Sequence, residues 1–189
     1  MIKRNLIVLA LVGAGTAFAL HASSSNEEDN CREADGLWFG ELGCEMARPR
    51  IDRIAVDKSD RSLIAYEGER EVRRFVVALG REPVGDKVRQ GDGRTPEGVY
   101  PVTFHNPASQ FHLSLRLGYP TRDQVAAARA ANIDPGGDIM IHGLPNATPW
   151  LGATHRARDW TSGCIALTND EIEWLYRFTP DGAAVEIVA

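Results

Sequence analysis

Short apolar runs separated by polar turns constrain the fold of this chain more than any other feature. The first three runs alternate with the turns "DKSDRS" and "YEGERE", which is typical of a strand meander. The predicted strands span roughly residues 52–57, 62–67 and 71–79, with further strand-like runs at 99–105, 110–117, 138–143 and 183–189. Strands that follow one another without intervening helices favour a mainly β body over a doubly wound sheet.

Two segments carry helix signals, and two others are predicted loops. Thr121 is an N-cap candidate for a helix that ends before Pro135-Gly136. A second helix begins at Thr168 or Asn169, with acidic residues in its first turn. Proline and glycine clusters predict long loops over 81–98 and 144–163. We therefore expect a β-sandwich or mixed sheet with two short helices and a long loop over the functional site.

The N-terminus has the pattern of an export signal. Residues 1–19 combine the cations Lys3 and Arg4 with an apolar stretch and a plausible cleavage site after Ala19. An uncleaved signal would anchor the protein to the membrane and still place the body outside the cytoplasm. We expect a flexible leader and appendage over 20–49 and one folded domain over 50–189.

Export changes the meaning of the three cysteines. An oxidising compartment favours disulfides, so Cys31 and Cys44, 13 residues apart, can pair and staple the appendage. Cys164 is then left over, and an unpaired thiol in an exported protein needs a reason to remain. The formal net charge of −5 and the scattered arginines give no support to nucleic-acid binding.

Cys164 has the surroundings of a candidate nucleophile. A cysteine nucleophile needs a base and donors for an oxyanion, and its thiol pKa usually needs a neighbour to lower it. His142 ends a predicted strand 22 residues earlier, and Gly163 allows close backbone approach. A cysteine and a histidine alone leave a structural role open. Zinc binding fits poorly because no Cys-x-x-Cys or His-x-x-x-His pair is present, so we predict neither metal nor cofactor.

The motifs "IMIHG" and "TSGCIAL" resemble those of the L,D-transpeptidase catalytic domain family. The segments "GDGRTPEG", "FHLSL" and "GGDIMIHGLPN" extend the resemblance over roughly residues 50–188 and are similar to one exported bacterial subgroup with a Gly-Cys-Ile-Ala signature. The family crosslinks or trims peptidoglycan. The resemblance implies a periplasmic acyltransferase that acts on stem peptides through a Cys164 thioester.

The resemblance also implies roles for individual residues. His142 is the expected base, the Gly143 carbonyl orients it, and backbone N–H groups at Gly163 and Cys164 bind the oxyanion. Thr161 and Ser162 either hydrogen-bond the histidine or substrate or shape the turn. Asp159 and Trp160 line the cleft, or Trp160 is part of the core. His155, Arg156 and Arg158 either meet the carboxylates of the substrate or form a solvated basic loop. Arg94 either binds substrate or pins its own loop.

Two positions depart from the family pattern. Ser162 stands where many members carry His, and Ala166 stands where many carry Arg or Asn. The Cys-Ile-Ala form resembles a subgroup that includes an amidase releasing a lipoprotein from peptidoglycan. An L,D-amidase or carboxypeptidase using the same site is therefore the first alternative, and an inactive cell-wall binding module is the second. The acceptor amine, stem-peptide preference and oligomeric state are open from sequence.

Overall fold

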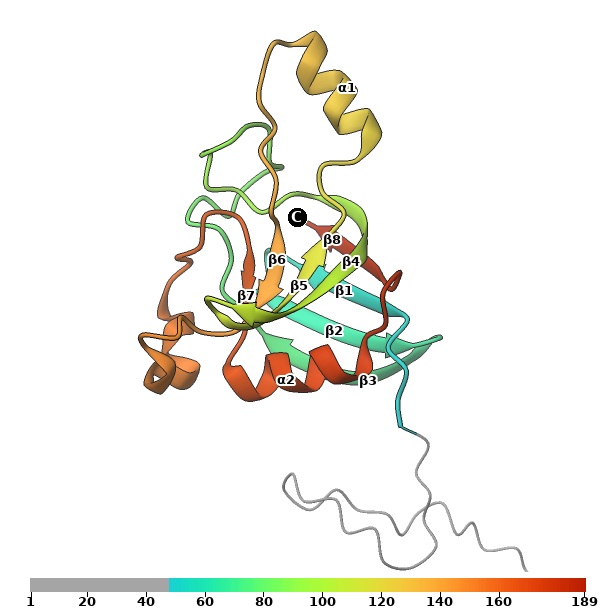
Figure 1. The fold of residues 1–189 in the computed structure, drawn as a ribbon, viewed down its shortest axis with the longest axis vertical. Helices are drawn as coiled ribbons and strands as arrows, with labels where there is room; N and C mark the ends of the chain where they lie inside the picture. The colour runs from blue at the N-terminus through green and yellow to red at the C-terminus, as the bar shows by residue number, and fades with distance from the viewer. Residues whose placement is uncertain (1–47) are drawn as a thin grey trace, which may run out of the picture. The chain divides into compact units, whose positions relative to one another are not determined.

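The sheet is continuous and curls on itself, with the C-terminal strand in its interior (Figure 1). The computed structural model describes residues 48–189. Within them, eight strands pair in the order β3-β2-β1-β8-β4-β5-β6-β7. They are β1 (Arg53–Asp57), β2 (Ser62–Glu67), β3 (Arg70–Val76), β4 (Gly98–Ser109), β5 (His112–Leu117), β6 (Met140–His142), β7 (Ile165–Ala166) and β8 (Ala184–Val188). The predicted mainly β fold is confirmed.

The first three strands form the predicted antiparallel meander. The turn between β1 and β2 is held by the Asp57 carboxylate, which accepts bonds from the Ser59 hydroxyl at 2.7 Å and the Asp60 N–H at 2.9 Å. β3 ends at Val76, three residues before the predicted end, because its partner β2 starts opposite that residue at Ser62. The chain then leaves β2 and makes an isolated bridge from Ala78 to Ala166.

The long strand β4 joins the two halves of the sheet. Its first residues pair with β8, and its remainder pairs with β5 after a register shift between Val102 and Phe104. Such irregularities bend a strand and increase its twist. β8 in turn lies parallel to β1. The bend separates the meander from the β4-β5-β6-β7 half, which carries the candidate site.

The apolar core lies against one face of the meander and under the second helix, α2 (Asn169–Phe178). β1 and β2 alternate buried and partly exposed residues, as strands with one covered face do. α2 buries three side chains one turn apart, namely Ile172, Leu175 and Phe178. Burying an apolar side chain of this size contributes about 1.5–3 kcal/mol, so this face of α2 holds the helix on the sheet.

Both predicted helices are present with their predicted caps. In α1 (Arg122–Ala130) the Thr121 N–H donates to Gln124 Oε1 at 2.8 Å, while the Gln124 N–H donates to Thr121 Oγ1 at 3.3 Å. In α2 the Thr168 N–H donates to Glu171 Oε2 at 3.0 Å. Reciprocal side-chain bonds of this kind satisfy backbone N–H groups that have no partner inside the helix.

The two predicted loops differ in outcome. Residues 81–97 are irregular, as expected. The other loop contains a helical segment that the sequence reading missed, η2 (Pro149–Ala157), a 3-10 helix interrupted at Gly152 with φ 48°. No helix within residues 48–189 is both long and apolar enough to cross a bilayer. The predicted signal peptide, Cys31, Cys44 and nearly all of segment 20–49 lie outside the described residues.

Candidate active site

The strand register relates His142 to Cys164. β6 and β7 run parallel, with Ile141 beside Ile165 and His142 beside Ala166. Cys164 directly precedes β7, two positions before Ala166. Because side chains alternate between the faces of a sheet, Cys164 and His142 leave the same face of neighbouring strands. Their Cα atoms are then about 8 Å apart, from a strand spacing of about 4.8 Å and a rise of about 3.3 Å per residue.

The imidazole of His142 is held at its Nδ1 atom. Nδ1 lies 2.7 Å from the carbonyl oxygen of Gly143. A carbonyl only accepts hydrogen bonds, so Nδ1 carries the proton and the Nε2 of the neutral ring keeps a free lone pair. Burial lowers the pKa of His142 to about 4. The hydrogen bond to Gly143 acts to raise this pKa, and the electrostatic interaction with His155 acts to lower it further. The ring is therefore neutral at pH 7 and able to accept a proton at Nε2.

Aromatic rings enclose this imidazole, which is only 3% exposed. The Phe111 ring lies 4.4 Å from it between centroids, and Trp160 meets it edge-on at 5.8 Å. The structure thus adds Phe111, which sequence reasoning missed. Phe111 stands between β4 and β5, 31 residues before His142, and begins the segment "FHLSL" that carries part of the family resemblance.

Gly143 can orient the ring because it packs tightly. Its N–H points to the carbonyls of Phe111 at 3.1 Å and Leu113 at 3.2 Å. A Cβ at this position would lie 2.8 Å from Asn169 Oδ1 and 2.9 Å from Ile172 Cγ2. Such distances are shorter than van der Waals contact, so a side chain here would displace the carbonyl that holds His142.

The thiol of Cys164 is free and half-buried. Its sulfur donates to the carbonyl of Asp138 at 3.5 Å. Burial raises the pKa of Cys164, and the Met140 N–H and the charge of Lys87 only partly offset that effect. Neighbours thus lower the thiol pKa as expected, but burial outweighs them and the net direction is upward. The resting pair is a neutral thiol with a neutral imidazole, which suits general-base activation of the sulfur.

Thr161 shapes the turn before Cys164. Its hydroxyl donates to the Cys164 carbonyl at 2.7 Å and accepts from the Gly163 N–H at 3.1 Å. The Gly163 N–H, one of the two expected oxyanion donors, is therefore occupied in this state. No hydrogen bond of the Cys164 N–H to another described residue is found. Gly163 has φ 132°, and a Cβ on it would lie 2.6 Å from the Arg94 carbonyl oxygen.

The loop over the site is held by Trp160 and His155. Trp160 Nε1 donates to His155 Nδ1 at 3.3 Å. His155 is 6% exposed, which corrects the expectation of a solvated basic loop: η2 folds this side chain inward. Burial and the neighbouring Arg156 lower the pKa of His155 to about 4, against the opposing charge of Glu171.

The remaining predicted residues are placed around this centre. The Asp159 carboxylate accepts from the Leu79 N–H at 2.8 Å and pairs with Arg61 at 2.9 Å, so it ties the loop to the end of the meander.

The side chain of Arg158 is exposed. Arg94 donates from Nη1 to the Asp86 carbonyl at 3.2 Å, and the exposed Ser162 hydroxyl accepts from Arg81 at 3.0 Å. Within the described part of the chain, no three His, Cys, Asp or Glu side chains gather as metal ligands do.

Comparison with known proteins identifies the family of this chain. The family model described as YkuD, the L,D-transpeptidase catalytic domain, matches residues 51–187. The chain therefore belongs to the L,D-transpeptidase catalytic domain family.

A curated relative in Escherichia coli K12, named "Putative L,D-transpeptidase YafK", is 29% identical over 132 residues. These residues are 66% of this chain and 46% of that protein.

Two solved structures share the fold. The helical cell shape determining protein Pgp2 of Campylobacter jejuni has a TM-score of 0.56 and 24% identity, covering 74% of this chain and 48% of its own. Bd1075 of Bdellovibrio bacteriovorus has a TM-score of 0.51 and 23% identity, covering 75% and 49%. The chain thus spans about half the length of these relatives.

Proposed function

We propose that this chain is an exported cysteine acyltransferase that acts on peptidoglycan stem peptides through a Cys164 thioester. The observation that carries the proposal is the pairing of β6 with β7, which directs Cys164 and His142 to one face of the sheet. Membership of the family supports a peptidoglycan-modifying activity. The apolar segment in residues 1–19 supports export to the periplasm, where such a substrate lies.

The first half-reaction forms the thioester. His142 Nε2 takes the proton from the Cys164 thiol as the sulfur attacks the carbonyl carbon of a diaminopimelate residue that is joined to a D-amino acid. The Cys164 N–H supports the negative charge on the oxygen. The tetrahedral intermediate collapses by breaking the C–N bond, and the leaving amine receives the proton from His142 Nε2.

The second half-reaction consumes the thioester. An amine from another stem peptide attacks the carbonyl, loses a proton to His142 and forms a new amide, while the Cys164 sulfur leaves and regains its proton. The net result is transpeptidation, which contributes to cell-wall biogenesis and to cell shape. The orientation of His142 requires only the Gly143 carbonyl, a neutral acceptor, in the place that a carboxylate occupies in other triads.

Hydrolysis is the second candidate, and the residues beside the nucleophile favour it. Ser162 and Ala166 stand where many family members carry His and Arg or Asn. Water would then resolve the thioester, making the protein an L,D-amidase or carboxypeptidase on a peptidoglycan or peptidoglycan–lipoprotein bond.

Mass spectrometry of products from tetrapeptide muropeptides, with and without an added amine acceptor, tests these functions. A crosslinked product that needs the acceptor supports transpeptidation, and a shortened or released peptide without it supports hydrolysis. Cys164→Ala should abolish either product, whereas the surface variant Arg122→Gln should retain it. Wild-type protein that binds muropeptides without turnover would instead be an inactive binding module.

A further inference from the structure

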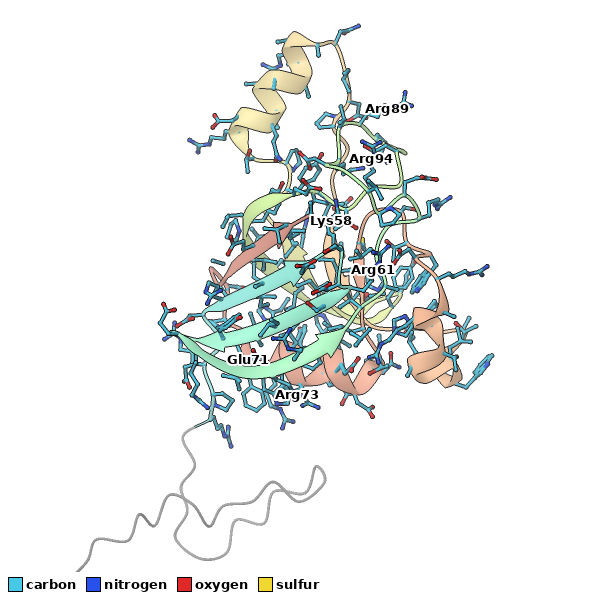
Figure 2. The ribbon with its side chains drawn as sticks, turned by 180° about the vertical axis from the view of Figure 1, so that it is seen from behind. Lys58, Arg61, Glu71, Arg73, Arg89 and Arg94 are labelled. Atoms are coloured by element: carbon cyan, nitrogen blue, oxygen red, sulfur yellow. The ribbon has the colours of Figure 1, made fainter. Side chains whose placement is uncertain are left out.

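The loop of residues 81–97 packs against the turn that carries Cys164. The Arg81 N–H donates to the Thr161 carbonyl at 3.0 Å, and the Glu82 N–H donates to the Gly93 carbonyl at 3.1 Å. Lys58 anchors the base of the loop through bonds to the Gly85 carbonyl at 2.7 Å and the Thr95 carbonyl at 3.1 Å (Figure 2). The loop is thus fixed in place beside residues 161–163.

A hollow of about 440 Å³ opens in this loop and is lined by three arginines, Arg81, Arg89 and Arg94. Figure 2 shows Arg89 and Arg94 on the same loop. Arg94 donates to a backbone carbonyl and Arg81 donates to Ser162 Oγ. Within residues 48–189, none of the three guanidinium groups forms an ion pair.

The acids that line the hollow do not balance this charge. The Asp92 carboxylate forms an ion pair with Lys87 at 2.8 Å. It also accepts hydrogen bonds from the Val88 and Arg89 N–H groups at 2.8 and 3.0 Å. Burial alone would raise the pKa of Asp92, but these bonds outweigh it and hold the pKa well below its usual value. Asp92 is therefore ionised and neutralised by Lys87. The exposed Glu82 is the other acid of the lining, which leaves the hollow positively charged.

The position of Arg81 connects the hollow to the nucleophile. Its Nη2 lies 3.0 Å from the hydroxyl of Ser162, which is two residues before Cys164. Two successive Cα–Cα steps of about 3.8 Å place the backbones of Ser162 and Cys164 within about 7.6 Å. A substrate whose carbonyl reaches the sulfur can therefore extend a neighbouring group to the Arg81 guanidinium.

We propose that the hollow lined by Arg81, Arg89 and Arg94 binds a carboxylate of the acyl-donor peptide, with Arg81 as the specificity-determining residue. The inference rests on the proposed function, because diaminopimelate carries a free side-chain carboxylate. A guanidinium binds a carboxylate through two parallel N–H···O bonds, which gives both affinity and orientation. The subsite uses a loop distant in sequence, since Ser162 and Ala166 leave no cation next to Cys164.

Binding measurements with the inactive variant Cys164→Ala test the subsite without turnover. The probes are a stem tetrapeptide with meso-diaminopimelate and the same peptide with the side-chain carboxylate converted to a carboxamide. Titration calorimetry should show about ten- to a hundredfold tighter binding of the carboxylate form. Arg81→Gln in this background should remove most of that preference, and the matched surface change Arg122→Gln should leave it intact.

The outcomes separate this inference from the proposed function. Equal affinity for the two peptides, or a preference that survives both Arg81→Gln and Arg89→Gln, would overturn the subsite even if wild-type protein turns over the peptide. A preference that depends on these arginines would support the subsite even if wild-type protein showed no turnover. Because Arg81 also packs in the loop, each variant is first checked by thermal unfolding. Arg89→Gln, exposed in the same hollow, replaces Arg81→Gln if the latter fails to fold.

Discussion

The Nδ1–H of His142 donates to the carbonyl oxygen of the next residue, Gly143, over 2.7 Å. This bond selects the neutral tautomer whose Nε2 is free to accept a proton. Its geometry depends on the position of one peptide group, which is clamped by Phe111, Leu113 and Asn169. Backbone packing around Gly143 therefore determines the orientation of the proposed base, His142.

Gly143→Ala should damage both stability and turnover. The new methyl group would lie 2.8 Å from Asn169 Oδ1 and 3.0 Å from the Phe111 carbonyl oxygen, so the backbone must move. Overpacking of this kind costs about 1–3 kcal/mol of unfolding free energy. The shifted carbonyl should also lower kcat on muropeptides. Urea unfolding and steady-state kinetics measure the two effects. The control is Gly68→Ala, where no atom lies within 4 Å and only the strain of φ 56° is added.

The thiol of Cys164 should be slow to alkylate at neutral pH. Burial raises the pKa of Cys164, so less thiolate is present than in an exposed cysteine. Iodoacetamide labelling, followed by mass spectrometry of the peptide that contains Cys164, should give a pH midpoint above that of the same residue in denaturant. A midpoint at or below the denatured value would show that a preformed thiolate, and not the neutral pair, is the resting state.

The unfolding free energy should decrease as pH falls from about 6.5 to about 4. His142 and His155 both have a pKa lowered to about 4, whereas an unfolded histidine titrates near 6.5. Between these values the unfolded chain binds more protons than the folded chain, so acid favours unfolding. Each histidine contributes on the order of 3 kcal/mol over the full interval.

Urea denaturation at pH 7 and pH 5 measures this dependence, with His155→Gln as the test variant. Glutamine does not titrate, and its amide oxygen can accept from Trp160 Nε1. The variant should therefore lose less stability than wild type between the two pH values. An equal loss in both proteins would mean that His155 is not buried as a neutral ring.

Asp159→Ala should loosen the attachment of the site loop. The carboxylate accepts from the N–H of Leu79, whose side chain is fully buried, and pairs with Arg61. Leaving that N–H unpaired costs about 1–3 kcal/mol. Glu71→Ala, which removes an exposed pair with Arg74, should cost less than about 1 kcal/mol and serves as the control. Similar losses from both substitutions in thermal unfolding would contradict the role of Asp159.

Local structure was readable from the sequence because its causes are local. Alternating apolar residues predicted β1 and β2, and the positions of Thr121 and Thr168 before helical segments predicted both caps. The 3-10 helix η2 was missed because Pro149 and Gly152 are also typical of irregular loops. The motifs around His142 and Cys164 identified the two residues, and the resemblance they carry predicted the family.

The sequence by itself thus determined the strand-rich character of the chain, its two capped helices and the identity of the candidate pair. Only the tertiary structure decided that β6 lies parallel to β7, that Phe111 and Trp160 enclose the imidazole, and that Arg81 reaches Ser162. It also decided the raised thiol pKa and the burial of His155. The physical reason is that strand register and desolvation arise from segments far apart in the chain, and no local pattern encodes which of them will meet.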